Sequence, residues 1–166
     1  LNIKEIKKSS QRKVKINFYK KDCLNIISIA RFSDQKDHAC LIKSINILKD
    51  NYNVRLILLG SGSLKEQIQN LIKNLDLSKN IKIYDFKKNP YPYLIRSDLF
   101  VLSSKYEGSP NVLLEAIYLK KFVISSDCPT GPREILDDGK GGELFTVGDY
   151  LTLAKKIEFF IKNKKK

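Results

Sequence analysis

The chain has 166 residues, of which 42% are hydrophobic, and its net charge is +13. This length allows one hydrophobic core and excludes two ordinary domains. No apolar run approaches the roughly 20 residues that cross a bilayer, so we expect no transmembrane helix.

Short apolar runs alternate with helical patterns along the chain. The runs are nearly continuous in apolar and β-branched residues, as expected of parallel strands that are covered on both faces. They predict strands at residues 24–29, 54–59, 81–84, 99–102, 122–125 and 143–147. Helices are predicted between them at residues 38–48, 64–75, 93–97, 110–119, 132–136 and 150–161. This alternation predicts an α/β fold with a doubly wound, Rossmann-like parallel sheet.

Residues 1–22 differ from the rest of the chain. They are polar and show no clear periodicity before Val14, so we interpret them as a linker and basic segment that precedes one domain at residues 23–166. Eight residues of this segment are Lys or Arg, and residues 155–166 carry six Lys. Basic ends could contact an anionic membrane surface, but a composition biased toward Lys is the stronger explanation for them. Nucleic acid is not expected, because no aromatic stacking platform interrupts the basic runs.

The single histidine and the three cysteines do not form a metal-binding pattern, so we predict no metal site. Cys23, Cys40 and Cys128 are isolated in the sequence, and we expect reduced thiols in a cytoplasmic protein. His38 is expected in the first turn of a surface helix. The first residue is Leu and the chain has no Met, which indicates a piece of a longer protein.

Two carboxylates stand eight residues apart in the segment KYEGSPNVLLEAI. Glu107 precedes a Gly-Ser-Pro turn, and Glu115 lies within an otherwise apolar helix. We predict Ser109 as the N-cap of this helix and Pro110 as its first residue. A helix start presents unpaired N–H groups that bind an anion such as phosphate. Carboxylates on both sides of a phosphate suit a nucleotide sugar, whereas the alternative makes both ordinary solvated residues.

Four predicted turns follow strands of the sheet. They contain Arg31, Gly60, Glu107 and the segment 127–133. Ligands of open α/β sheets bind outside the carboxyl ends of the strands. The sequence therefore predicts that these four turns converge on one binding site.

Five segments, in this order, resemble the retaining GT-B glycosyltransferases with an E-x7-E motif, the glycosyl transferases group 1. ISIARFSDQKDHACLI is similar to the strand and turn that hold the donor diphosphate, and LILLGSGSLKEQI to a Gly-x-Gly loop. SDLFVLSS resembles the next strand, and EGSPNVLLEA the E-x7-E motif itself. VISSDCPTGPREILDDGKGGELF resembles the loop of the subgroup that uses UDP-hexoses and UDP-N-acetylhexosamines. The resemblance covers residues 24–160, with Ala30 and Asp37 where the family often has Gly.

The resemblance assigns a role to each matching residue. The catalytic residues would be Arg31 and Lys36, which hold the diphosphate, and Glu107, which engages hydroxyls of the transferred sugar. Glu115 would accept hydrogen bonds from the ribose hydroxyls. The remaining donor-binding residues would be Gly60, Gly62, Gly108, Ser109, Pro110, Asn111, Thr130, Gly131 and Arg133. No metal or other cofactor is expected, because two cations and a helix start would stabilise the leaving phosphate.

By this resemblance the chain is the C-terminal, donor-binding half of a GT-B enzyme. The implied reaction moves a hexose or N-acetylhexosamine, with retention, from a UDP-sugar to a glycan or lipid-linked acceptor. The implied process is the synthesis of a bacterial surface polysaccharide of the O-antigen or capsule type. The acceptor would bind to a preceding domain, so this chain alone would transfer nothing. The enzyme would be cytoplasmic and peripheral on the inner membrane.

Two other classes of function are open. Gly60-Ser61-Gly62 follows a strand, as in a dinucleotide-dependent oxidoreductase, but Lys65 replaces the third glycine of that fingerprint. A non-catalytic nucleotide-sugar-binding or interaction module is the second alternative. The charged site residues are all intact, which argues against such a degenerate transferase half.

Overall fold

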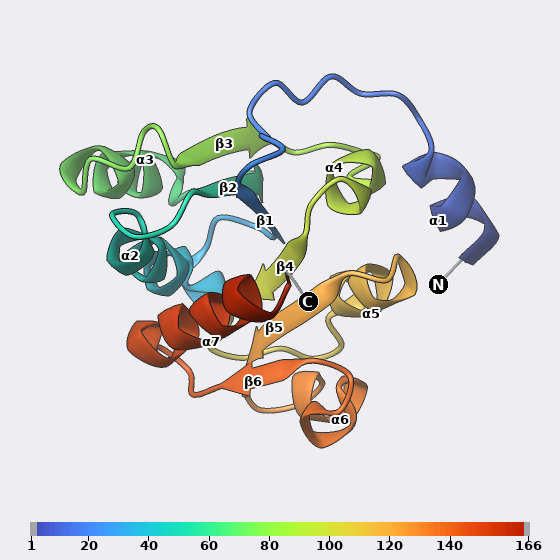
Figure 1. Cartoon of the computed structure of the whole chain (residues 1–166). Coiled ribbons are helices and arrows are strands. Elements are labelled where there is room, and N and C mark those ends of the chain that lie inside the picture. Colours follow the sequence, from blue (N-terminus) through green and yellow to red (C-terminus); the bar gives the residue numbers. More distant parts are fainter. Residues whose placement is uncertain (1–2, 165–166) are drawn as a thin grey trace.

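A computed structural model describes residues 3–164 and shows a six-stranded parallel sheet (Figure 1). The strands are β1 (Leu24–Ile29), β2 (Val54–Gly60), β3 (Ile81–Asp85), β4 (Leu99–Leu102), β5 (Phe122–Ser126) and β6 (Glu143–Phe145). Their order is β3-β2-β1-β4-β5-β6, so the chain begins in the centre, builds one half and then crosses to build the other. This is the doubly wound, Rossmann-like α/β fold that the sequence predicts.

Helices cover both faces of the sheet. One layer contains α2 (His38–Leu48), α3 (Lys65–Asn74) and α7 (Tyr150–Asn163), and the other contains α4 (Tyr91–Ile95), α5 (Asn111–Tyr118) and α6 (Pro132–Ile135). Successive strand residues point to opposite faces, so Ile26 joins the first layer's core and Ile27 the second. Within residues 3–164, no helix is both long and apolar enough to cross a bilayer.

The structure contains a helix that the sequence pattern does not reveal. Helix α1 (Ile3–Ser10) lies in the segment interpreted as an unpatterned linker. It packs against α4, with Ile6 buried at its contact face. The Asn89 side chain also donates a hydrogen bond of 3.0 Å to the carbonyl of Ser9. The absence of periodicity before Val14 was therefore a wrong guide to local structure, although the proposed domain boundary stays a prediction.

The other predicted elements are present with shifted ends. Helix α4 begins and ends two residues earlier than the predicted range 93–97, because Pro90 stands as its N-cap. Strand β6 ends at Phe145, two residues before the predicted end. The remaining strands and helices agree with the predicted ranges to within two residues.

His38 occupies the first position of α2, but the prediction of a surface position is wrong. Its side chain is only 3% exposed and packs edge-on against Phe32, with ring centroids 5.1 Å apart. Both ring nitrogens are buried without a hydrogen-bond partner within the described part of the chain. Burial, with a smaller contribution from Lys36, lowers the pKa of His38 from 6.5 to about 4.

Candidate functional site

The predicted site residues lie in, or directly beside, the loops at the carboxyl ends of four strands. The loop after β1 carries Arg31 and continues into η1 (Asp34–Lys36), and β2 ends at Gly60. The loop after β4 carries Glu107, and the loop after β5 contains residues 127–131. The four turns therefore converge on one edge of the sheet, as the fold type requires.

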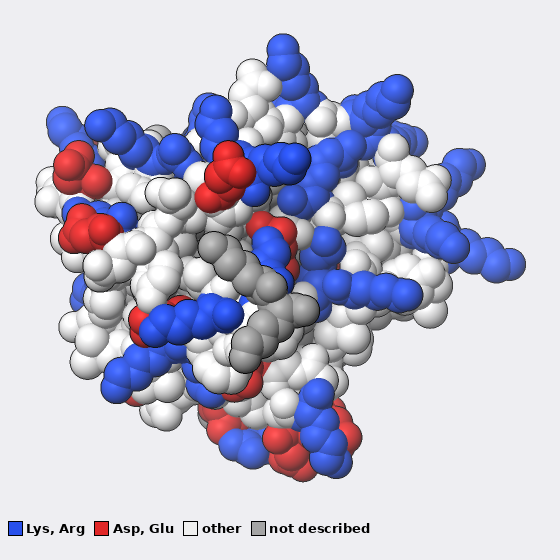
Figure 2. Space-filling view, in the orientation of Figure 1, with Lys and Arg blue, Asp and Glu red and all other residues white. Residues whose placement is uncertain are grey.

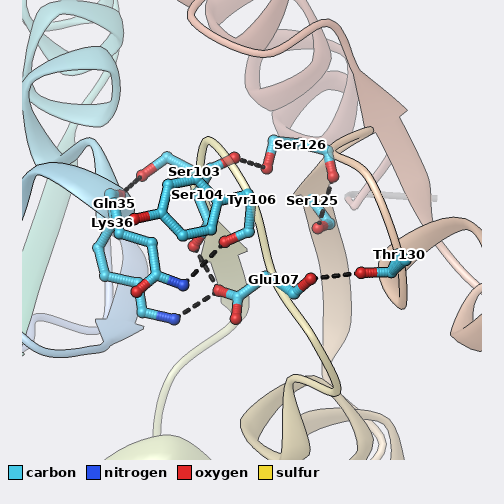
Figure 3. Close-up of polar contacts among 9 residues, drawn as sticks. All are labelled: Gln35, Lys36, Ser103, Ser104, Tyr106, Glu107, Ser125, Ser126 and Thr130. Atoms are coloured by element: carbon cyan, nitrogen blue, oxygen red, sulfur yellow. Dashed lines mark hydrogen bonds and ion pairs between the residues drawn. The ribbon is translucent and has the colours of Figure 1, made fainter.

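Glu107 and Lys36 form a largely buried ion pair at this edge (Figure 3). The Lys36 Nζ lies 2.5 Å from Glu107 Oε1, and the two side chains are 18% and 6% exposed. Ser104 donates a hydrogen bond of 2.5 Å to the same carboxylate oxygen. The Ser103 hydroxyl donates to the carbonyl of Lys36 at 2.9 Å, which ties the end of β4 to the loop after β1. The structure therefore brings two of the three predicted catalytic residues into direct contact.

A second set of hydrogen bonds holds the loop of Glu107 against β5. Ser126 donates to the carbonyl of Ser104 at 2.6 Å, and the hydroxyl of Thr130 donates to the carbonyl of Glu107 (Figure 3). Sequence reasoning assigned no role to these serines. The only signal for them is the polar Ser-Ser pair at the end of two apolar strands, which predicts buried hydroxyls in need of partners.

Helix α5 begins one residue later than expected. Its first residue is Asn111 and its N-cap is Pro110, which makes no side-chain capping bond. The prediction of Ser109 as N-cap is thus wrong, and Ser109 is exposed in the turn before the helix. Pro110 is buried because its ring lies against Gly131, where an added Cβ would stand 2.7 Å from the proline Cδ. This contact fixes the turn that leads into α5.

Glu115 lines a cavity of about 620 Å³ between α1, α4 and α5. The cavity is also lined by Glu5, Ile6, Ser9, Arg12, Lys88, Asn89, Tyr91 and Asn111. The hydroxyl of Tyr91 lies 3.1 Å from Glu115 Oε1. Burial raises the pKa of the Glu115 carboxyl, and the bond from Tyr91 opposes that shift. Sequence reasoning missed Tyr91, Arg12 and Lys88, because nothing in their local pattern connects them to Glu115.

Arg31 lines a separate, more apolar cavity of about 500 Å³. Its walls are Ile29, Ala30, Leu59, Gly60, Ser61, Phe86, Lys87 and Pro90. Phe86 is 67% exposed, which is unusual for a large aromatic residue beside a cavity. Segment 86–91 supplies residues to this cavity and to the cavity of Glu115. The two cavities are therefore neighbours along the same edge.

Two predicted donor-binding glycines have a packing role. A Cβ at Gly60 would lie 1.9 Å from the carbonyl oxygen of Ala30, and one at Gly62 would lie 2.3 Å from that of Phe32. The backbones after β1 and β2 meet here, and only glycine permits their approach. No heavy atom of residues 3–164 lies within 4 Å of a Cβ placed at Gly108, so that position has room for a side chain.

Replacing Gly60 with Ala should lower the free energy of unfolding by about 2–3 kcal/mol, because overpacking would force the two backbones apart. Gly108→Ala is the matched control, with an expected change below about 0.5 kcal/mol. Urea unfolding of both variants measures the difference. Equal losses in the two variants would contradict this packing role.

Arg133 forms ion pairs with neighbouring carboxylates after β5. It forms a two-pronged ion pair with Asp127 and a longer contact of 3.4 Å with Asp138. Together with Thr130 and Gly131 it lines a shallow cavity of about 410 Å³ after β5. Of these three predicted residues, only Thr130 has a hydrogen bond to the Glu107 loop. Within residues 3–164, no three His, Cys, Asp or Glu side chains are grouped to hold a metal ion.

The chain is similar to known proteins along nearly all of its length. The profile of the family described as Glycosyl transferases group 1 matches residues 9–166. An uncharacterized glycosyltransferase of Methanocaldococcus jannaschii is 45% identical over 117 residues, which are 70% of this chain and 29% of that protein. A second relative, from Campylobacter jejuni, is 31% identical over 140 residues, which are 84% of this chain and 38% of that protein. It is named N-acetylgalactosamine-N,N'-diacetylbacillosaminyl-diphospho-undecaprenol 4-alpha-N-acetylgalactosaminyltransferase. This chain thus spans well under half the length of these relatives.

Solved structures share the fold. TarM of Staphylococcus aureus, in a complex that includes UDP, superposes with a TM-score of 0.80 at 27% identity. The match covers 90% of this chain and 31% of that chain. The lipopolysaccharide outer core galactosyltransferase WaaB superposes with a TM-score of 0.79 at 25% identity, over 88% of this chain and 42% of that chain. The six-stranded sheet is therefore the fold of known glycosyltransferase domains.

Proposed function

This chain belongs to the glycosyl transferases group 1 family, and we propose that it is the donor-binding domain of a retaining glycosyltransferase that uses a UDP-sugar. The sugar moved would be a hexose or an N-acetylhexosamine. The observation that carries the proposal is the pair of neighbouring cavities, one apolar beside Arg31 and one that contains Glu115, with the Lys36–Glu107 pair at the same edge.

Each part of a nucleotide sugar has a matching group on this edge. The flat, apolar base suits the cavity beside Phe86, whose exposed ring offers a stacking face. The carboxylate of Glu115 suits the two hydroxyls of ribose, because ionised carboxylates only accept hydrogen bonds. The buried carboxylate of Glu107 suits hydroxyls of the transferred sugar.

The diphosphate would be held by cations rather than by a metal ion. Arg31 offers a planar fork of donors, and Lys36 has two further N–H groups besides the one directed to Glu107. The N-terminal N–H groups of α5 add a partial positive charge. As the bond from the sugar to the phosphate breaks, these groups stabilise the charge that develops on the leaving phosphate. Retention then follows if the acceptor attacks from the face of the leaving group, with the phosphate taking its proton.

The acceptor would bind outside this chain. The name of the Campylobacter relative describes a diphospho-undecaprenol acceptor, and that of another relative, from Rhizobium meliloti, describes lipopolysaccharide core biosynthesis. We therefore propose a glycan or lipid-linked acceptor, bound by another domain of a longer enzyme, in the synthesis of a bacterial surface polysaccharide. The chain by itself would bind donor and transfer no sugar.

A cytoplasmic enzyme with a lipid-linked acceptor would work at the membrane surface, and the N-terminal segment is suited to contact it. Figure 2 shows Lys and Arg side chains crowded over the region where Figure 1 places α1 and the segment after it. The exposed basic residues of this segment are Lys4, Lys7, Lys8, Arg12, Lys13, Lys15, Lys20 and Lys21. At the other end, Lys162 pairs with Glu158 and Lys164 with Asp98, while Lys165 and Lys166 lie outside the described residues. Co-sedimentation with anionic and neutral vesicles at low and high salt tests this contact.

UDP should stabilise the chain in the presence of EDTA, because the proposed diphosphate site consists of Arg31, Lys36 and a helix start. At 100 times its dissociation constant, UDP should add about 2.7 kcal/mol to the free energy of unfolding. Chemical unfolding with and without UDP measures this gain, with Glu115→Ala as the variant expected to lose most of it. Binding that appears only with Mg²⁺ or Mn²⁺ would overturn the metal-free site.

Two results would favour the alternative functions. Stabilisation by NAD instead of UDP would favour the oxidoreductase alternative. Donor binding without turnover in the longer enzyme would favour the non-catalytic module.

A further inference from the structure

Among residues 3–164, the carboxylate of Glu115 has one hydrogen-bond partner in its cavity. Oε1 accepts a hydrogen bond of 3.1 Å from the hydroxyl of Tyr91. Within residues 3–164 this is the only hydrogen bond that the Glu115 side chain makes, so Oε2 has no partner among them. An ionised carboxylate has acceptor capacity for about four hydrogen bonds. Within residues 3–164, the bond from Tyr91 therefore uses only a part of that capacity.

Tyr91 is held in place by its neighbours in the fold. It is the first residue of α4 and lies between Pro90 and Pro92, whose rings fix the φ angles on both sides of it. Helix α1 packs over α4, and the hydrogen bond from Asn89 to the carbonyl of Ser9 ties that helix to the same loop. Burial, with help from Glu115, raises the pKa of Tyr91 to about 12. The hydroxyl is therefore a proton donor throughout the neutral range.

We propose that Tyr91 is a positioning residue for Glu115, which holds one carboxylate oxygen so that the other faces the two vicinal hydroxyls of the nucleoside's ribose. This inference rests on the proposed function, because it assumes a nucleoside diphosphate in the cavity. The role is more specific than packing, since the ring alone would fill space without fixing the carboxylate. A held carboxylate loses less rotational freedom when the ligand binds, and that preorganisation strengthens binding.

The hydrogen bond from Tyr91 should change how the affinity for ribose depends on pH. Within residues 3–164, the charged and titratable groups that line the cavity of Glu115 are Glu5 and Arg12 from the N-terminal segment, Lys88 from the loop after β3, and Tyr91 itself. The positive charge of the chain's N-terminal amino group also acts to lower the pKa of Glu115. Burial raises the pKa of Glu115, and the Tyr91 hydrogen bond acts in the opposite direction by favouring the ionised form. Removing that hydroxyl should raise the pKa of Glu115 further. The carboxylate would then become neutral, and the affinity for ribose would fall, at a higher pH than in the wild type.

The test is the variant Tyr91→Phe, with Tyr93→Phe as its matched control. Tyr93 lies on the same helix, and its ring packs against Tyr84 at 5.5 Å, away from the Glu115 hydrogen bond. Calorimetric titration of the chain with UDP between pH 5 and pH 8 gives the affinity of each variant. Comparing each variant with the wild type at the same pH removes the titration of UDP itself. Thermal melting shows whether both variants are folded.

At neutral pH we expect Tyr91→Phe to bind UDP about tenfold more weakly, since a hydrogen bond to a charged group is lost. Its deficit should grow as pH falls, while Tyr93→Phe follows the wild type. A second ligand, 2′,3′-dideoxyuridine diphosphate, lacks the hydroxyls and should bind both tyrosine variants and the wild type alike. Equal losses for UDP and the dideoxy ligand, or a Tyr91→Phe profile parallel to wild type at all pH values, would overturn the positioning role. Failure of the wild type to bind UDP at all is a different result, and it would reject the proposed function itself.

Discussion

Replacing Lys36 with Met should lower the free energy of unfolding by about 3–5 kcal/mol, because it leaves a buried carboxylate without a counter-ion. The carboxylate is that of Glu107, which is 6% exposed and lies 2.5 Å from the Lys36 ammonium. Ser104 would remain as a hydrogen-bond donor, but a hydroxyl offsets only part of a buried negative charge. Urea unfolding at neutral pH measures the loss.

The control is a lysine of the same edge whose ion pair is open to solvent. Lys105 lies 2.6 Å from Asp34, but the two side chains are 40% and 81% exposed. Lys105→Met should therefore cost far less stability than Lys36→Met. Adding Glu107→Gln to Lys36→Met should recover part of the loss, since the buried group would no longer be charged. If Lys36→Met is no worse than Lys105→Met, or if Glu107→Gln recovers nothing, the buried charge is not the source of the instability.

This ion pair also bears on the proposed chemistry. A lysine with four freely rotating side-chain bonds would lose entropy on binding a diphosphate, whereas Lys36 is already held by Glu107. The same contact holds the Glu107 carboxylate in place. We infer that the ion pair preorganises both side chains for the donor. Lys36 is held where it can bind the phosphate, and Glu107 is held where it can bind the sugar. Loss of UDP affinity in Lys36→Met at temperatures where the variant is folded would support that inference.

The strands could be predicted from the sequence because strands buried on both faces consist of continuous apolar residues. Residues 54–59 are an example. Helix α1 could not be predicted from its own sequence, IKEIKKSS, in which lysines surround the buried Ile6. An eight-residue helix is marginal in isolation. Its stability comes from packing on α4, which is some 80 residues away in the sequence. The spacing of Ile3 and Ile6 fits one face of a helix, but it does not identify the surface that buries Ile6.

In the candidate site, too, some features follow from the local sequence and others depend on tertiary packing. The types of residue at Arg31, Lys36, Glu107 and Glu115 follow from motifs, and the fold brings their loops to one edge. The pairing of Lys36 with Glu107 was not predictable, because 71 positions separate them and either could have faced solvent. The bond between Tyr91 and Glu115 has the same origin, since it depends on how α4 and α5 pack. Motifs thus identify the charged groups, and tertiary packing decides which of them meet.

Acid should destabilise this chain more steeply than its carboxylates alone would, because of His38. The histidine has a pKa of about 4 in the folded chain and 6.5 as its ordinary value, which applies to the unfolded chain. Between these values the unfolded chain binds more protons, so the free energy of unfolding falls as the pH falls from 6.5 to 4. The full loss from this one group is about 3 kcal/mol. Charging His38 would also place a cation near Lys36, two residues before it in the loop that holds the proposed diphosphate site.

The variant His38→Phe removes the titration and keeps an aromatic ring against Phe32. At pH 7 it should be about as stable as the wild type or more stable. The reason is that it also removes two buried ring nitrogens that have no hydrogen-bond partner among residues 3–164. As the pH falls to 4, the wild type should lose about 3 kcal/mol relative to the variant, which urea unfolding at several pH values can measure. His38 is the only histidine of the chain, so its NMR titration is unambiguous and should have a midpoint near 4. A midpoint near 6.5, or stability curves of the two proteins that stay parallel from pH 7 to pH 4, would show that the imidazole is hydrated and carries no such penalty.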